Sequence, residues 1–385
     1  MRGSRRSDPP GLSRGPGVDQ MPFSRLTTLV VALAVASRVE AQDTTSTPQT
    51  SRNEPVPPAP AVQIDGLLQV WYLDGHTVTS AHDTYRIRRA DVKLSGIISP
   101  RVRWRISLDG AKLLNLNKTT TVAADSSVLT DVAIDQRSRI LQEASINVTL
   151  APALRVDVGQ QIIPLSYEGI TAASQIETIE RTMFIAERGR GGGISDVRDI
   201  GAEVRGSIAD NHVDYQLGVF NEFGDTQNST DQNDQKATIG RLAFRLPGVP
   251  ALQLGASGGF QGGPLPQQRR ERAGGEAQFR NRWLTLRTEA MGARDGTLRR
   301  LGYYGLGAFR PTPDIELVGR WDYWDPDLHN ESGTSNAAER EIVAGASYFI
   351  EGGATRLAAN VVRSTFPSGI VQSSTLLLFS LQVVW

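Results

Sequence analysis

The stretch Val102-Arg103-Trp104-Arg105-Ile106-Ser107-Leu108-Asp109 alternates between apolar and polar side chains at every step. Successive side chains of a β-strand point to opposite faces of its sheet, so this period of two predicts a strand with one apolar and one polar face. The same alternation recurs at 154–161 and at 200–208. These segments predict a sheet whose two faces meet different surroundings.

Segments of this kind, bounded by Gly, Pro, Asn or Asp, occur roughly sixteen times at about ten residues each, which is the length of a strand that crosses a membrane. We expect them near 63–74, 84–98, 101–112, 138–150, 153–163, 199–208, 212–221, 237–246, 250–260, 273–281, 283–292, 301–310, 314–324, 340–350, 354–364 and 374–385.

The connections between these segments alternate in length. Tight links such as Ser99-Pro100 and Ala151-Pro152 are followed by long ones, at 113–137, 164–198, 222–236, 261–272 and 325–339. Short turns on one rim and long loops on the other are typical of outer-membrane barrels. We therefore predict an all-β fold, a transmembrane antiparallel β-barrel of about sixteen strands with a long inserted loop after the fifth strand. A soluble β-sandwich would seldom need so many strands.

The last predicted strand adds a separate signal. Its apolar positions run from Leu377 to Trp385 at every second residue, so the strand ends on an aromatic side chain. Such a terminal strand resembles the signal that the outer-membrane assembly machinery recognises. A hydrophobic edge strand of a soluble sheet would fit this segment alone equally well.

Composition excludes several classes of protein. The 385 residues are 39% hydrophobic and 21% charged, contain no cysteine, and balance 41 Lys and Arg against 41 Asp and Glu. No disulfide framework is therefore possible, and no basic excess points to nucleic acid. Downstream of residue 41 no apolar run approaches the roughly 20 residues of a membrane helix.

The N-terminal part divides into three segments before the barrel. Residues 21–41 place a basic start, an apolar run too short to span a membrane and small residues at Val39 and Ala41 in the order of a secretory signal peptide. Residues 1–20 are expected to be an upstream extension, and 42–62, rich in Thr, Ser and Pro, a linker. One domain is expected over 63–385.

Four short motifs, in this order, resemble the phosphate-selective porin O/P family. They are Tyr85-Arg86-Ile87-Arg88-Arg89-Ala90-Asp91-Val92-Lys93-Leu94-Ser95-Gly96, Val156-Asp157-Val158-Gly159-Gln160-Gln161-Ile162-Ile163-Pro164-Leu165, Ile179-Glu180-Arg181-Thr182 and Arg198-Asp199-Ile200-Gly201. The resemblance implies a sixteen-stranded trimeric porin of the bacterial outer membrane, with outer-membrane lipid around it. It also implies a pore lined by basic residues that favours phosphate or polyphosphate. The sequence departs from the family at Gln161 and Ile163, and it contains only four lysines.

If the apolar register faces lipid, the polar register lines a water-filled lumen. The inward positions then carry both signs of charge, namely Arg89, Lys93, Arg103, Arg105, Arg155, Arg205, Arg241, Arg245, Arg287 and Arg320 together with Asp91, Asp109, Glu143, Asp157, Glu203, Asp214, Glu289, Glu316 and Asp322.

Six of these cations are candidates for pore-lining, anion-binding residues: Arg89, Lys93, Arg103, Arg105, Arg155 and Arg205. Planar guanidinium donors can engage two phosphate oxygens at once. We favour Arg103 and Arg105, which lie two apart on one face. The alternative is structural, because inward Arg and Asp or Glu on neighbouring strands often pair to stiffen a barrel wall.

The loop 164–198 is expected to fold inward and narrow the pore. Its candidates for the constriction are Arg181, Arg188 and Arg190. Long loops in compact domains are usually functional or disordered. A solvated surface loop without a specific role is the alternative.

No constellation of catalytic or metal-binding residues stands out. The four histidines are scattered, without a partner at metal-ligand spacing, so neither a metal nor a cofactor is expected. Aromatic residues such as Trp71, Tyr303, Tyr304 and Trp321 lie near predicted strand ends, as in the girdles at a membrane interface, and Trp324 is a candidate to stack in the lumen instead.

We predict a passive channel for small anions, not an enzyme, exported to the bacterial outer membrane. The alternatives are a general, weakly selective porin, favoured by the mixed lumenal charge, and a structural or interaction barrel closed by its loops. An outer-membrane hydrolase is the least favoured. Inward glycines (Gly159, Gly201, Gly218 and Gly255) favour an open lumen, whereas a plugged barrel needs large apolar inward residues.

Overall fold

The computed structural model describes residues 62–77, 80–81, 83–114, 116–122, 128–134, 139–185, 194–231, 233–265, 269–329, 337–369 and 372–385. The predicted extension, signal peptide and nearly all of the linker lie outside the described residues.

Each of the sixteen segments predicted from the alternating sequence forms a β-strand. One 17-stranded sheet contains β2 (Ser80–Ala81), only two residues long, and sixteen long strands. The long strands are β1 (Gln63–Thr77), β3 (Thr84–Ser99), β4 (Val102–Asp109), β7 (Leu141–Ala151), β8 (Leu154–Ile162), β9 (Arg198–Ile208), β10 (Val213–Phe220), β11 (Ala237–Arg245), β12 (Leu252–Gln261), β13 (Arg270–Arg280), β14 (Leu284–Asp295), β15 (Leu298–Thr312), β16 (Ile315–Asp325), β17 (Glu339–Ile350), β18 (Thr355–Thr365) and β19 (Ser374–Val384).

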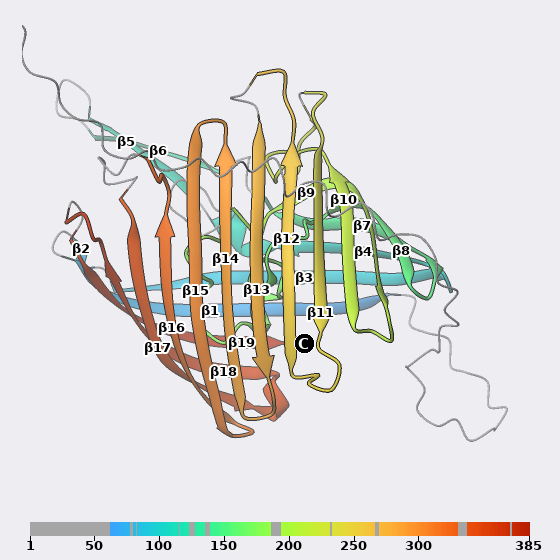
Figure 1. Cartoon of the computed structure of the whole chain (residues 1–385). Coiled ribbons are helices and arrows are strands. Elements are labelled where there is room, and N and C mark those ends of the chain that lie inside the picture. The colour runs from blue at the N-terminus through green and yellow to red at the C-terminus, as the bar shows by residue number, and fades with distance from the viewer. Residues whose placement is uncertain are drawn as a thin grey trace, which may run out of the picture. The chain divides into compact units, whose positions relative to one another are not determined.

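The sheet closes on itself. Each long strand pairs antiparallel with its neighbours along the chain, and β1 pairs with both β3 and β19, so Leu67 lies opposite Asp91 on one side and Val384 on the other. Closure leaves no open sheet edge. The predicted sixteen-stranded antiparallel barrel is confirmed (Figure 1). Among the described helices, none is long and apolar enough to cross a membrane.

The two rims differ as expected. One rim, called the short-turn rim, carries connections such as 152–153 and 209–212, and the long-loop rim carries 110–140, 163–197 and 221–236 (Figure 1). One exception lies on the long-loop rim, where only Gly296 and Thr297 join β14 to β15. Gly296 has φ 61°, a left-handed conformation that glycine adopts without steric cost.

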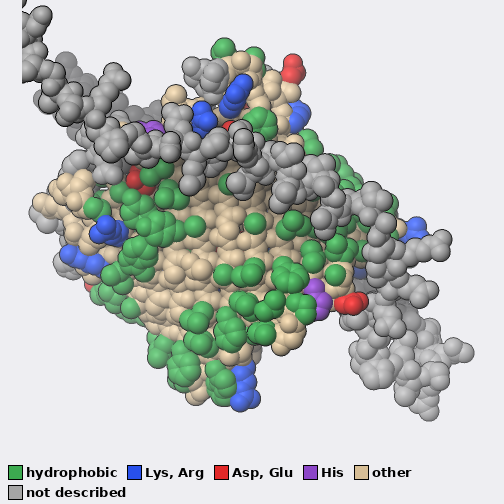
Figure 2. Space-filling view, viewed as in Figure 1, with side chains coloured by type: hydrophobic (Ala, Val, Ile, Leu, Met, Phe, Trp, Pro, Cys, Tyr) green, Lys and Arg blue, Asp and Glu red, His purple; other side chains and the backbone are tan. Residues whose placement is uncertain are grey.

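The wall is apolar outside and polar inside along most of its length. On β11, Leu242 and Phe244 are 47% and 39% exposed, whereas Arg241 and Ala243 are 7% and 2% exposed. On the face shown in Figure 2, hydrophobic and uncharged surface covers the middle of the wall, and charged side chains lie near its margins. This band fits the hydrocarbon core of a membrane.

One register shift changes which arginines face inward. Gln69 of β1 lies opposite Arg89 and Val70 opposite Ile87, so Arg88 is an extra residue in β3. Such a β-bulge interrupts the alternation of side chains. Arg88 and Arg89 are therefore both buried on the lumenal side, at 9% and 6% exposure, whereas strict alternation would turn Arg88 towards lipid.

The predicted loop 113–137 contains structure that the prediction missed. Two strands, β5 (Leu116–Val122) and β6 (Val128–Ile134), form a separate two-stranded hairpin. Their sequences, LNKTTTV and VLTDVAI, are rich in the β-branched residues that favour strands. The first of these sequences is mostly polar, with Lys118 followed by three threonines, so a search for alternating apolar residues does not detect it.

Candidate functional site in the barrel lumen

The loop between β8 and β9 folds into the lumen, as expected, and is bonded to the wall at several points. Its short helix α1 (Tyr167–Ile170) begins at Ser166, whose hydroxyl accepts from the Gly169 amide at 2.7 Å. The Ser166 amide donates to Ser257 of β12 at 3.0 Å, and the Tyr167 amide donates to Glu289 of β14 at 2.8 Å. These wall side chains satisfy amides that a helix start leaves without intrahelical partners.

A second anchor is the carboxylate of Glu177. It lies 2.8 Å from the Arg287 guanidinium of β14 and also pairs with Arg280 of β13. Burial disfavours the charged carboxylate, but the two guanidinium groups outweigh burial and hold the pKa of Glu177 below its usual value. The negative charge of the loop thus pairs with two arginines of the barrel wall.

Three further wall side chains bind the loop backbone. Nη1 of Arg320, on β16, donates to the Glu180 carbonyl at 2.7 Å. Nη1 of Arg356, on β18, donates to the Ile176 carbonyl at 2.6 Å, and Asn360 of the same strand accepts from the Ile179 amide at 2.7 Å. The loop therefore reaches from β8 across to β16 and β18.

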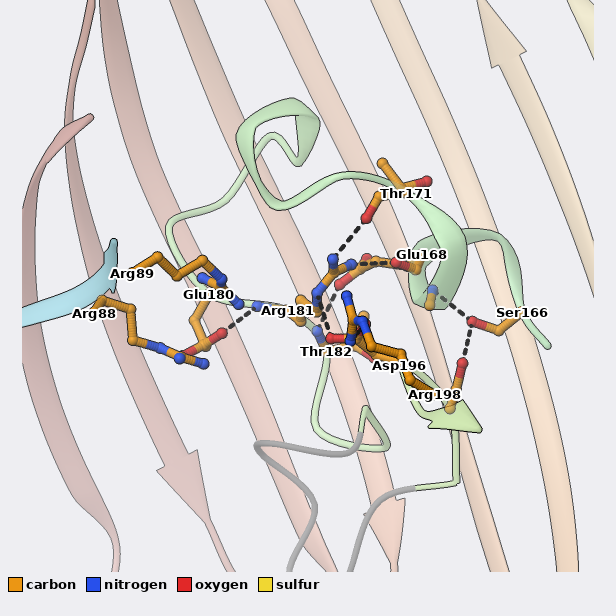
Figure 3. Close-up of polar contacts among 12 residues, drawn as sticks. Arg88, Arg89, Ser166, Glu168, Thr171, Glu180, Arg181, Thr182, Asp196 and Arg198 are labelled. Atoms are coloured by element: carbon orange, nitrogen blue, oxygen red, sulfur yellow. Dashed lines mark hydrogen bonds and ion pairs between the residues drawn. The ribbon is translucent and has the colours of Figure 1, made fainter. Parts of the chain in front are cut away.

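Arg181 is buried within the loop, with 3% exposure. Its guanidinium donates to the carbonyls of Glu168 and, at 2.6 Å, of Thr171, and lies 3.2 Å from the Asp196 carboxylate (Figure 3). It holds the two ends of the loop together, so its charge is buried among partners within the loop, and a role of Arg181 at the constriction stays a prediction. Arg188 and Arg190 lie outside the described residues.

Arg88 and Arg89 reach from β3 towards the same loop (Figure 3). Nε of Arg88 lies 3.3 Å from the Glu180 carboxylate, and Arg89 donates to Gln69 at 2.9 Å. Their burial means that Arg89 also belongs to the anchored wall and not to an open surface.

The lumenal side of β10 to β16 is partly filled with apolar side chains. Phe184 of the loop is 1% exposed and packs against Gly302, where an added Cβ would lie 2.5 Å from the Phe184 Cβ. Inward Gly201 and Gly218 make room for Phe220. These inward glycines therefore provide space for the side chains of neighbouring residues. Large apolar residues such as Phe184 and Phe220 also point into the lumen.

The opposite side of the lumen, on β4, β8 and β9, keeps exposed cations. Arg103 is exposed, and the side chains of Arg105 and Arg155 are 49% and 40% exposed although they face inward. Arg205, on β9, is 29% exposed. Together with Lys93, which is half-buried, these are the candidates that the structure leaves accessible.

Carboxylates partly balance these cations. Asp157 lies 3.0 Å from Arg155 and also pairs with Arg205, and Glu143 lies 3.2 Å from Arg105. Within the described part of the chain, the Arg103 side chain has no hydrogen bond or ion pair. Arg103 is thus the lumenal arginine whose charge is least compensated.

A second loop, between β10 and β11, also bonds to the lumenal rim. The Asp199 carboxylate accepts from the amides of Glu222 and Gly224 at 3.1 and 2.9 Å. Gln160 of β8 donates to the Asn228 side chain and accepts from the Asn228 amide, each at 2.7 Å. This loop narrows the same end of the lumen from another side.

The anchoring roles of Glu177, Asp199, Arg356 and Asn360 were not predicted from the sequence. Arg356 and Asn360 occupy the inward register of a predicted strand, and Asp199 belongs to a quoted motif, so alternation and motif position could have found them. Among the described residues, no group of three or more His, Asp or Glu could hold a metal ion.

Comparison with known proteins places the chain among porins. The family model for phosphate-selective porin O and P matches residues 62–289, more than half of the 385 residues. No curated protein sequence matches significantly.

Three solved structures illustrate the similarity of fold. OmpF of Salmonella typhi, in a complex with daunomycin, has a TM-score of 0.59 at 10% identity and covers 84% of this chain and 97% of its own. The anion-selective porin from Comamonas acidovorans gives 0.57 at 10% identity, with 84% and 99% covered. The trimer form of OmpT from Vibrio cholerae gives 0.53 at 9% identity, with 84% and 99% covered.

Proposed function

Since the chain belongs to the phosphate-selective porin O and P family, and is thus an outer-membrane channel, we propose that it conducts small anions by passive diffusion, phosphate and polyphosphate among them. The proposed unit is a homotrimer in outer-membrane lipid. A trimer form of one structural neighbour supports this assembly.

The observation that carries the anion preference is the exposure of inward-facing guanidinium groups on β4 and β8. Arg105 and Arg155 keep 49% and 40% of their side-chain surface exposed inside the barrel, and Arg103 beside them has no acidic partner among the described residues. Arginine side chains arranged around a pore favour anions over cations, and several weak binding sites let an ion enter the pore and still leave it. Guanidinium forks suit phosphate oxygens.

The mechanism needs no catalytic step. Solutes pass along the side of the lumen that β4, β8 and β9 border, because the inserted loop and its apolar packing occupy the side of β10 to β16. Width is set by the anchored loop and ion preference by the exposed arginines. Phosphate is the proposed solute because its oxygens can accept from two guanidinium donors at once.

A general, weakly selective porin is the second candidate. The observation in its favour is the carboxylates of Asp157, Glu203 and Glu143 that lie among the exposed arginines. If their charge cancels the arginines over the roughly 10 Å Debye length at 0.1 M salt, the pore discriminates little between anions and cations.

Single-channel recording in planar bilayers tests the proposal. Under a salt gradient, we expect a reversal potential of anion-selective sign and a reduction of chloride current when phosphate is added. Arg103→Ala with Arg105→Ala should weaken both effects, whereas Arg282→Ala, in the short turn 281–283, should leave them unchanged. Current without anion preference would favour the general porin, and folded protein without current would favour a structural barrel.

A further inference from the structure

Four arginines lie at the long-loop end of neighbouring strands and point away from the lumen. They form what we call the outer arginine patch: Arg294 of β14, Arg299 of β15, Arg340 of β17 and Arg363 of β18.

The alternation of each strand fixes their direction. On β15, Arg300 faces inward and pairs with Asp295 at 2.7 Å, so its neighbour Arg299 faces outward, and it is exposed. On β17, Glu341 is buried at 2% and Arg340 beside it is exposed. The patch is therefore on the side of the wall that meets the membrane.

The patch carries positive charge that its own strands do not neutralise. Arg294 and Arg299 lie directly opposite each other in the β14–β15 ladder, an arrangement of like charges that is normally unfavourable. Within the described residues, neither Arg299 nor Arg340 has a side-chain partner. Arg294 bonds to the Gly296 carbonyl at 2.9 Å and Arg363 to the Thr375 hydroxyl at 2.8 Å, both uncharged. One outward carboxylate, Glu271 of β13, is the ladder neighbour of Arg294.

Aromatic side chains lie between the two halves of the patch. Tyr303 and Tyr323 stack with ring centroids 4.9 Å apart, and Trp321 lies 5.5 Å from Tyr303. Tyr323 is directly opposite Arg340 in the β16–β17 ladder. Aromatic rings of this kind favour the level where lipid head groups meet hydrocarbon.

The other end of the same wall has mixed charge. At the short-turn rim, the exposed Arg282 follows β13, and the turns after β15 and β17 expose the carboxylates of Asp314 and Glu351. The outer arginine patch itself lies at the rim with long loops, which faces the cell exterior in barrels of this kind. Uncompensated arginine on a lipid-facing wall is favourable where it meets an anionic head group.

We propose that the outer arginine patch is a binding site for an outer-leaflet lipid whose head group carries phosphate. The guanidinium groups of Arg299 and Arg340 bind the phosphate oxygens, and the rings of Tyr303, Trp321 and Tyr323 pack at the boundary between head group and acyl chains. This lipid site lies outside the lumen, so it is independent of the proposed solute pathway.

Native mass spectrometry of the full-length protein in detergent tests this site, with diphosphorylated lipid A and its dephosphorylated form as probes. We expect the phosphorylated form to bind more tightly. Arg299→Gln with Arg340→Gln should weaken it by roughly 25-fold, about fivefold for each arginine, because one basic residue near a charged head group contributes about one kcal/mol. Arg282→Gln, at the opposite rim, should bind as the unchanged protein does.

A variant that retains the charge and a competing ligand distinguish the possible causes of weaker lipid binding. Arg299→Lys with Arg340→Lys should keep most of the affinity, which separates lost charge from a misfolded barrel. Equal binding of both lipid forms, or unchanged binding by the double Gln variant, would overturn the proposal. Displacement of the lipid by millimolar inorganic phosphate would instead assign the patch to free phosphate, and a changed oligomeric state with unchanged lipid binding would assign it to a protein contact.

Discussion

Arg88 and Glu180, which are 92 positions apart in the sequence, meet inside the barrel with Nε and Oε2 3.3 Å apart. The first belongs to the wall and the second to the loop that crosses the lumen. Each lies in one of the short motifs that resemble the porin family, and the family is confirmed by the match over residues 62–289. Two of the motifs thus form one structural contact, between the wall and its inserted loop.

Loss of a wall anchor should release the loop without opening the barrel. We expect Arg320→Ala to destabilise the folded protein by about 3–5 kcal/mol, because it removes a buried guanidinium that pairs with Asp322 and Glu341 and that donates to the Glu180 carbonyl of the loop. Single-channel recordings should then show larger and noisier conductance, and limited proteolysis should cut within 163–197. Arg280→Ala is a milder control, because Arg287 still holds Glu177. Unchanged conductance in Arg320→Ala would mean that the loop does not limit the pore.

Removal of lumenal carboxylates should act in the opposite direction to removal of arginines. We expect Asp157→Asn with Glu203→Gln to raise the anion-to-cation permeability ratio by about twofold to fivefold, since a unit charge at 4 Å is worth about 1 kcal/mol in water. The variant frees Arg155 and Arg205 from their acidic partners. Reversal potentials at low salt give the measurement, and a shift towards cations would contradict the assigned pathway.

The anchor at Glu177 should weaken in acid. Its folded-state pKa is lowered by Arg287 and Arg280 against the effect of burial, so its contribution to stability is fully present above the unfolded-state pKa of about 4.3. The contribution is lost as pH falls through the lowered folded-state pKa. The Tm difference between the unchanged protein and Glu177→Gln should be constant from neutral pH to about pH 5 and shrink below about pH 4. A difference that persists in strong acid would show that charge is not what holds this anchor.

Filling the space beneath Phe184 should displace the loop by steric means alone. Gly302→Val places side-chain atoms where even a Cβ would lie 2.5 Å from Phe184. We expect overpacking to cost about 1–3 kcal/mol and conductance to become unstable. Gly305→Val is the matched control on the same strand, because an added Cβ there meets nothing within 4 Å. Equal behaviour of the two variants would argue against docking of Phe184 at this position.

The strands and their number follow from the sequence because one physical constraint acts on every strand. Lipid outside and water inside impose a period of two, and residues such as Leu242, Arg241 and Phe244 obey it without knowledge of their neighbours. The β-bulge at Arg88 could not be predicted in this way, because a register shift depends on the partner strand.

The lumen was predicted less well than the wall. Alternation places Arg89 and Arg103 alike on the inner face, yet one is bonded to Gln69 and buried while the other is exposed. The difference is made by the loop, whose course depends on contacts with β14, β16 and β18 far along the chain. The outward Tyr303 and Trp321 fit the predicted girdle, whereas Trp71 and Tyr304 are buried inside, and so is Trp324, as the sequence allowed.

The seam between β1 and β19 has a consequence for how the protein is made. Gln69 donates to Gln382 across it at 2.7 Å, although the two residues are 313 positions apart. β1, which leaves the ribosome early, therefore cannot complete its pairing until β19, one of the last strands to be synthesised, is available. Until they meet, both expose unpaired backbone that can join other chains into aggregates. A cell that produces this barrel must therefore keep the unfinished chain bound to chaperones from its synthesis until its insertion into the membrane.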